Sequence, residues 1–124
     1  ELLAGGDRRA LLGTLTAVVE PATVRQWQDD AQRVHVAPAL LAYVQRLLEA
    51  SRASPRWPLG LSPRAGLALV SAARAWALID GRGQVLPEDV QAVFPGVAAH
   101  RLKAVDDRGD DDPLQQLLHS VDVD

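Results

Sequence analysis

Apolar residues recur with helical spacing along most of this 124-residue chain, and one stretch is apolar on almost every side. That stretch, residues 59–81, reads L-G-L-S-P-R-A-G-L-A-L-V-S-A-A-R-A-W-A-L-I-D-G. Ser62 suits an N-cap, Pro63 the first helical position, and Gly81 a helix end. A helix that is apolar all round is normally buried, so the pattern predicts a central helix with its large side chains in the core. These side chains are Leu67, Val70, Trp76 and Ile79.

Two further helical patterns precede the central stretch. In the first, Val24, Trp27 and Ala31 form an apolar stripe of helical period, so Trp27 is expected in the core rather than in a ligand cage. The second pattern begins at Pro38, and charges of alternating sign lie on its outer side. Its predicted inward-facing residues are Leu40, Leu41, Val44, Leu47 and Leu48.

Shorter elements are predicted after the central helix. Residues 85–86 can pair with residues 34–36 as a two-strand patch. Pro87 begins another helix, which Pro95 and Gly96 should interrupt. The predicted fold is therefore all-α, a bundle of four to five helices around one buried central helix, with room for the minor two-strand patch.

Composition removes several classes of function. The chain contains no cysteine, so it has no disulfide framework and no thiolate metal site, and its three histidines show no ligand spacing. No apolar run approaches the roughly 20 residues that span a bilayer, so membrane insertion is not expected. The chain begins at Glu1 and has no methionine, so we expect it to be a piece of a longer protein.

Charge is distributed unevenly. Residues 106–124 hold seven Asp against one Arg, a net charge of −6, and because the whole chain is −3 the remainder carries +3. Residues 106–113 are predicted to form a flexible acidic loop, followed by a short amphipathic helix that docks back. A mildly basic body without a dense Lys/Arg stripe argues against nucleic-acid binding.

Arg64 stands in the first turn of the central helix, where the backbone amides already present positive partial charge. A cation there is disfavoured by about 0.3–1 kcal/mol, whereas a bound anion would reverse the sign of the effect. The alternative is that Arg64 pairs with a carboxylate or caps a neighbouring helix. Arg52 and Arg56 fall in or beside the segment directly before this helix, so three arginines converge near one helix start. This arrangement suits a phosphate or an acidic partner, although the segment could also be an ordinary solvated loop.

Residues 59–90 resemble the C-terminal helical lid domain of MoxR-type AAA+ ATPases. That family pattern is a G-x-S-P-R-A helix start, an Ala/Leu-rich helix, a G-R turn and V-x-P-x-D-V. Pieces such as R-V-H-V and H-R-L agree in order, so the resemblance covers roughly residues 21–102. It implies that Arg64 is the sensor-two arginine, which reaches the terminal phosphates of the nucleotide. Ser62, Arg52 and Arg56 would then be auxiliary phosphate or interdomain contacts.

The resemblance also implies an organisation. Residues 1–19 would connect to a missing ATPase core, residues 20–105 would form the lid, and residues 106–124 an acidic loop with a short helix. The chain has no G-x-x-x-x-G-K-[ST] loop, so alone it should neither bind nor hydrolyse ATP and should hold no catalytic residue. The resemblance implies that ATP and Mg²⁺ are bound by the parent protein, which would be a cytoplasmic ring-forming chaperone. The expected partners are the ATPase core, neighbouring subunits and an unidentified client protein.

A second interpretation involves no nucleotide. Ala68, Ser71 and Ala75 share one narrow, small-residued face of the central helix with Arg64. A partner helix could lie in such a groove, which would make the chain a stand-alone helical module for protein–protein interaction. An upstream phosphate-binding loop in the coding sequence would decide in favour of the lid.

Overall fold

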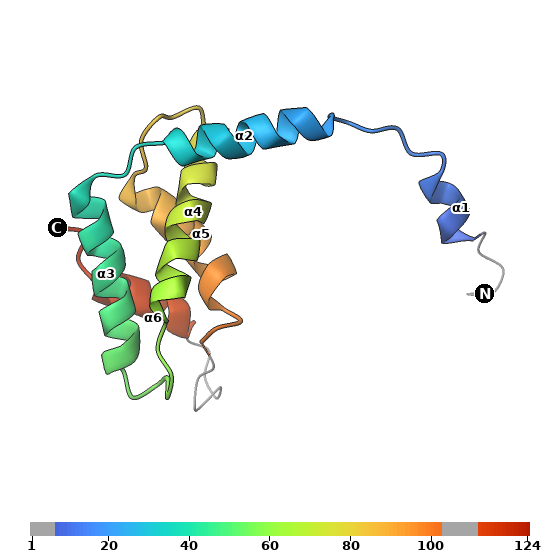
Figure 1. Ribbon diagram of the computed structural model, residues 1–124. Helices are drawn as coiled ribbons and strands as arrows, with labels where there is room; N and C mark the ends of the chain where they lie inside the picture. Colours follow the sequence, from blue (N-terminus) through green and yellow to red (C-terminus); the bar gives the residue numbers. More distant parts are fainter. Residues whose placement is uncertain (1–6, 103–111) are drawn as a thin grey trace.

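The computed structural model describes residues 7–102 and 112–124 and is helical throughout its compact part (Figure 1). The predicted all-α fold is confirmed. The described residues form six helices, which are α1 (Arg8–Leu12), α2 (Pro21–Arg33), α3 (Pro38–Ala53), α4 (Pro63–Ile79), α5 (Pro87–Ala98) and α6 (Pro113–Ser120).

Helix α4 lies at the centre and packs most extensively on α5, with α2 and α3 on its other sides. The face that it buries consists mainly of small residues, because small residues let neighbouring helix backbones approach closely. This face is formed by Ala65, Gly66, Leu69, Ala73 and Ala77.

The prediction that the large side chains of α4 fill the core is wrong. Leu67 is 72% exposed, Trp76 50% and Ile79 85%, while Val70 is only partly buried. The sequence gives no preferred face to a helix that is apolar all round, and the neighbouring helices pack against its small side instead.

Helix α3 presents the expected stripe to the core. Leu40, Val44, Leu47 and Leu48 are buried, together with the ring of Tyr43. The prediction fails for Leu41, which is 48% exposed because it lies at the edge of the stripe. The segment after α3 turns back on the core through Trp57, which is also buried.

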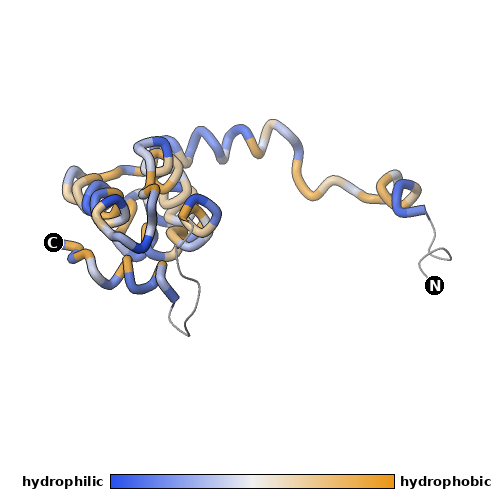
Figure 2. The backbone as a smooth tube through the Cα atoms, turned by 90° about the horizontal axis from the view of Figure 1, so that it is seen from below, coloured by the Kyte–Doolittle hydropathy of each residue, from blue (hydrophilic) through white to orange (hydrophobic). Residues whose placement is uncertain are grey.

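Helix α2 lies across the carboxyl-terminal half of α4 and has no fully buried residue. Trp27, predicted for the core, is half exposed, because α2 touches the bundle along one edge only. Residues 7–19 form an arm that extends away from the bundle, and α1 packs on no other described helix (Figures 1 and 2). The colouring of Figure 2 shows apolar positions along this arm, and they are exposed.

Two predictions after α4 need correction. Pro95 does not interrupt the helix, because α5 continues through it to Ala98, and a proline near the end of a helix removes only one backbone bond. The two-strand patch is reduced to a single parallel bridge between His35 and Gln84. The His35 amide donates to the Gly83 carbonyl, and its carbonyl accepts from the Val85 amide, both at 2.9 Å.

Helix α6 docks on α3 and α5 through Leu117 and Leu118, which confirms the predicted amphipathic helix. Arg46 of α3 donates to the carbonyls of Asp122 and Val123 and so holds the segment after α6. Most of the predicted acidic loop, residues 106–111, lies outside the described residues.

Candidate functional site

The amino-terminal end of α4 begins as the sequence predicts. The Ser62 side chain accepts a hydrogen bond from the Ala65 amide at 3.2 Å, and Pro63 occupies the first turn. Arg64 follows and is exposed, as expected. Among the described residues, no hydrogen bond or ion pair involves its guanidinium group. The helix end therefore presents an accessible cation in its first turn, where the Ala65 and Gly66 amides are bonded to Ser62.

The residue before the cap is fixed by α3. The Leu61 amide donates to Ser51 Oγ at 2.8 Å, and Ser51 Oγ in turn donates to the Leu48 carbonyl at 2.7 Å. Arg52 Nε donates to the Leu61 carbonyl at 3.0 Å. Both backbone polar groups of Leu61 are thus bound by consecutive residues of one helix. Ser51 was missed by sequence reasoning, since a serine near a helix end has no distinctive pattern.

The three arginines predicted to converge have different surroundings. Arg52 lies beside the amino-terminal end of α4, where its side chain donates a hydrogen bond to the carbonyl of Leu61, the residue before Ser62. Arg56 is directed to α6 instead, since its guanidinium donates to the Gln116 side chain. The structure therefore brings Arg52 to the start of α4, whereas Arg56 joins the loop before α4 to α6.

An apolar groove of about 400 Å³ lies between α2 and the carboxyl-terminal half of α4, beside the contact between the two helices. Only one of its lining residues is polar, and none is charged, so it offers no acid, base or nucleophile. The predicted small face of α4 reaches this groove at Ala75 and is otherwise open, with Ser71 exposed. The groove is lined by Val24, Trp27, Gln28, Ala31, Ala75, Leu78 and Ile79.

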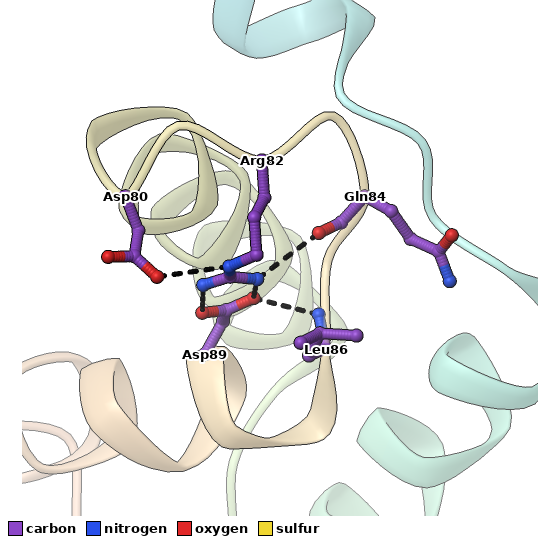
Figure 3. A network of polar contacts seen from close by, with 5 residues as sticks. All are labelled: Asp80, Arg82, Gln84, Leu86 and Asp89. Carbon is purple, nitrogen blue, oxygen red and sulfur yellow. Dashed lines mark hydrogen bonds and ion pairs between the residues drawn. The ribbon is translucent and has the colours of Figure 1, made fainter.

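The carboxyl-terminal end of α4 closes on a glycine with left-handed backbone. Gly81 has a φ of 77°. Its amide donates to the Leu78 carbonyl, and the Arg82 amide donates to the Ala77 carbonyl. These two bonds form a Schellman motif. The side chain of Arg82 then reaches across the turn to Asp89 in α5 (Figure 3).

Asp89 is the most buried charged residue described, and every contact in Figure 3 leads to it or to its partner. It binds the Arg82 guanidinium with both oxygens, one of them at 2.7 Å, and accepts from the Leu86 amide at 2.7 Å. Arg82 also contacts Asp80 at 3.0 Å and the Gln84 carbonyl at 3.3 Å. The sequence analysis did not single out Asp89 and missed this network.

The hydrogen bond from Arg82 lowers the pKa of Asp89 below its usual value, and the Leu86 amide adds to this, although burial opposes both. The hydrogen bonds from Arg82 to Asp89 and Asp80 in turn raise the pKa of Arg82. The network therefore remains charged at neutral pH. It joins the end of α4 to the start of α5.

The described residues differ in how well they suit a nucleotide and its metal. Arg64 and the amides of α4 suit the anionic phosphate groups. By contrast, no group of three or more His, Cys, Asp or Glu in residues 7–102 and 112–124 could hold a metal ion. None of the helices in these ranges is long and apolar enough to cross a membrane.

Comparison with known families matches residues 49–117 to the AAA lid domain. The chain belongs to the AAA lid domain family. The matched region runs from the end of α3 into α6, so the start of α4, its glycine turn and the first part of α6 lie within it.

Several curated proteins are similar to this lid domain. Chaperone MoxR1 of Mycobacterium tuberculosis is 40% identical over an alignment of 84 residues that covers 60% of this chain and 22% of that protein. Protein MoxR of Paracoccus denitrificans is 46% identical over 81 residues, covering 55% and 24% of the two chains. The uncharacterized protein YeaC of Bacillus subtilis is 35% identical over 75 residues, covering 60% and 23%. The resemblance to MoxR-type lids is thus confirmed, and the chain spans less than a quarter of each relative.

A solved structure shares the fold of the lid domain. The crystal structure of a candidate ATPase from Cytophaga hutchinsonii superposes with a TM-score of 0.64 over 74% of this chain and 31% of that one. The sequence identity is 24%. The arrangement of helices described above is therefore found within a larger protein.

Proposed function

We propose that this lid domain serves a MoxR-type ATPase, in which Arg64 senses the terminal phosphates of ATP bound by a separate nucleotide-binding core. The observation that carries the proposal is the state of Arg64. It is exposed in the first turn of α4, at the positive end of the helix dipole, and no described residue neutralises it. Such an unpaired cation is unfavourable there unless an anion joins it.

The chemistry of Arg64 suits this role. A guanidinium presents a rigid fork of N–H donors that matches phosphate oxygens, and it remains charged at any physiological pH. A cation already in place where negative charge develops stabilises a transition state more than a ground state. ATP supplies the phosphate groups when bound to the core. Ser62 caps the amino-terminal end of α4, and Arg52 lies beside that end.

We further propose that, in the parent protein, the core carries out the ATP chemistry and the lid contacts the core and neighbouring subunits. The lid contributes no phosphate-binding loop, so ATP binding, Mg²⁺ ligation and hydrolysis depend on the core. Residues 1–19 connect the core to the lid of residues 20–105, and residues 106–124 complete it. The lid contacts its own core and neighbouring subunits of a cytoplasmic ring, whose nucleotide state drives maturation of client proteins.

Substitution of Arg64 tests the sensor role in the protein that carries both core and lid. Arg64→Ala should lower steady-state ATP hydrolysis by about 100-fold, the size typical of losing one preorganised electrostatic donor. Arg64→Lys should rescue poorly, because lysine lacks the planar fork. The melting temperature should change little, since Arg64 is a surface residue.

Arg25→Ala is the matched control, because Arg25 is an exposed helical arginine on α2, away from the start of α4. It should leave hydrolysis near that of the parent. An Arg64→Ala protein that is destabilised but turns over normally would overturn the sensor proposal and make Arg64 a structural residue.

The alternative function, a helical interaction module without nucleotide, is favoured by the apolar groove between α2 and α4. The groove is also compatible with a lid, because a lid must contact other domains. Normal hydrolysis in Arg64→Ala, combined with loss of a protein partner in Ile79→Ser, would favour the module.

A further inference from the structure

We propose that Ser51 and Arg52 are positioning residues for Arg64, because together they fasten the start of α4 to the end of α3. This inference rests on the proposed function of Arg64. It gives Arg52 a role different from direct phosphate contact. It also makes α3 and the amino-terminal turn of α4 one rigid unit.

The fastening acts on a single residue, Leu61. Its amide and its carbonyl are both bound by α3, through Ser51 Oγ at 2.8 Å and Arg52 Nε at 3.0 Å. Ser51 is fully buried, and its hydroxyl is oriented by its own bond to the Leu48 carbonyl. The Leu61 side chain is buried as well, so the residue is held by its backbone and by its side chain.

Close packing leaves the joined segments little room to slide. A Cβ atom on Gly60 would lie 2.5 Å from Arg52 Cα and 2.6 Å from Arg52 N, so this segment rests directly on the α3 backbone. On the next turn, a Cβ on Gly66 would lie 2.8 Å from Leu48 Cδ1. The two glycines thus bring both sides of the α4 start into contact with α3.

Arg64 lies only three residues beyond Leu61, and the intervening backbone is constrained. Ser62 is held as the N-cap by its bond to Ala65, and Pro63 has a fixed φ. The position of Arg64 is therefore set by Leu61 with little slack. Since a misplacement of about 1 Å can lower a rate about 100-fold, loosening Leu61 should weaken catalysis through Arg64.

Hydrogen exchange of the 124-residue chain tests the fastening without nucleotide. Arg52→Ala removes one bond to Leu61, so exchange of the Leu61 amide should accelerate by about fivefold, as expected for one hydrogen bond. Arg46→Ala is the matched control, because Arg46 is also on α3 and also donates to backbone carbonyls, but near the chain end. It should leave Leu61 exchange unchanged. Unchanged exchange in Arg52→Ala would overturn the inference.

A double-mutant cycle in the protein with core and lid tests the link to Arg64. Arg52→Ala should lower ATP hydrolysis by about tenfold when Arg64 is present and should add nothing in an Arg64→Ala background. Equal losses in both backgrounds would mean that Arg52 acts independently of Arg64, which overturns the inference. So would a loss of hydrolysis without faster Leu61 exchange, the result expected of a direct phosphate contact.

The two proposals fail in different ways. Normal hydrolysis in Arg64→Ala alone rejects the sensor role itself, and with it any catalytic positioning. Impaired hydrolysis in Arg64→Ala with additive effects of Arg52→Ala rejects only the positioning role. Ser51→Ala provides a second variant, because it removes the acceptor of the Leu61 amide, and it should also accelerate the exchange of that amide.

Discussion

The inward and outward faces of α4 are built from opposite kinds of apolar residue. The inward face is mostly alanine and glycine, whereas the outward face carries Leu67 and Ile79. Hydropathy alone would bury the larger side chains. Close approach decides otherwise, because α3 and α5 can pack tightly only on a narrow, small-residued surface. Size, rather than hydrophobicity, therefore determines which face of this helix points inward.

The difference extends to function. The outward face begins at Arg64, continues through Leu67 and Ser71, and meets α2 at the apolar groove. Under the proposed function, this outward face is the surface that would contact other domains.

The largest effect expected concerns one leucine from each face. Leu69→Ala should destabilise the chain by about 2–5 kcal/mol, because Leu69 is buried and its removal leaves a cavity. Leu67→Ala should change stability by under about 0.5 kcal/mol, because Leu67 is already largely exposed. Urea unfolding midpoints of the two variants decide the matter. Equal midpoints would mean that the assignment of faces is wrong.

A second prediction concerns the network that holds α5 against the inward face. Asp89→Asn should cost about 1–3 kcal/mol at neutral pH, less than a fully buried pair, because Arg82 remains partly solvated. The lowered pKa of Asp89 stabilises the fold above its unfolded pKa of about 4, and this contribution is lost as pH falls through and below that value.

The pH dependence provides the control for the Asp89 network. The difference in denaturant midpoint between the parent and Asp89→Asn should shrink as the pH is lowered from 7 to 3. A constant difference between the two proteins would show that the ion pair does not titrate with folding.

The smallest effect tests how narrow the inward face must be. Gly66→Val should destabilise by about 1–3 kcal/mol, because the added side chain meets Leu48 at a distance that requires repacking. Ala68→Val, on the outward side, should cost only the lower helix propensity of valine, under about 1 kcal/mol. Thermal unfolding of both variants gives the comparison. A tolerated Gly66→Val would show that α3 and α4 can separate without loss.

The ends of the helices were predictable because local chemistry determines them. Prolines at the first turns of α3, α4 and α5, the Ser62 cap and the Gly81 stop all lie where the sequence places them. The facing of α4 and the exposure of Trp27 were not predictable in this way, since both depend on where other helices pack. The predicted break at Pro95 was wrong for a related reason, because the packing of the rest of α5 compensates for one lost backbone hydrogen bond.

The candidate site divides along the same line. Arg64 could be found from its motif and from its unfavourable place in the first turn. Ser51 could not, because its role depends on a contact with Leu61 that is ten residues away and has no sequence pattern. The role of Arg64 toward phosphate remains a prediction.

The alanine-rich inward face of α4 also has an entropic consequence. Ala65, Ala73 and Ala77 have no side-chain rotamers to lose, so their burial leaves the rotational freedom of the folded chain unchanged. The residues that keep rotamer freedom are those outside, such as Leu67 and Ile79. Each loses about 0.5–1 kcal/mol of that freedom only when another surface covers it. For Leu67 and Ile79, the entropic cost of ordering the side chain therefore arises on association rather than on folding.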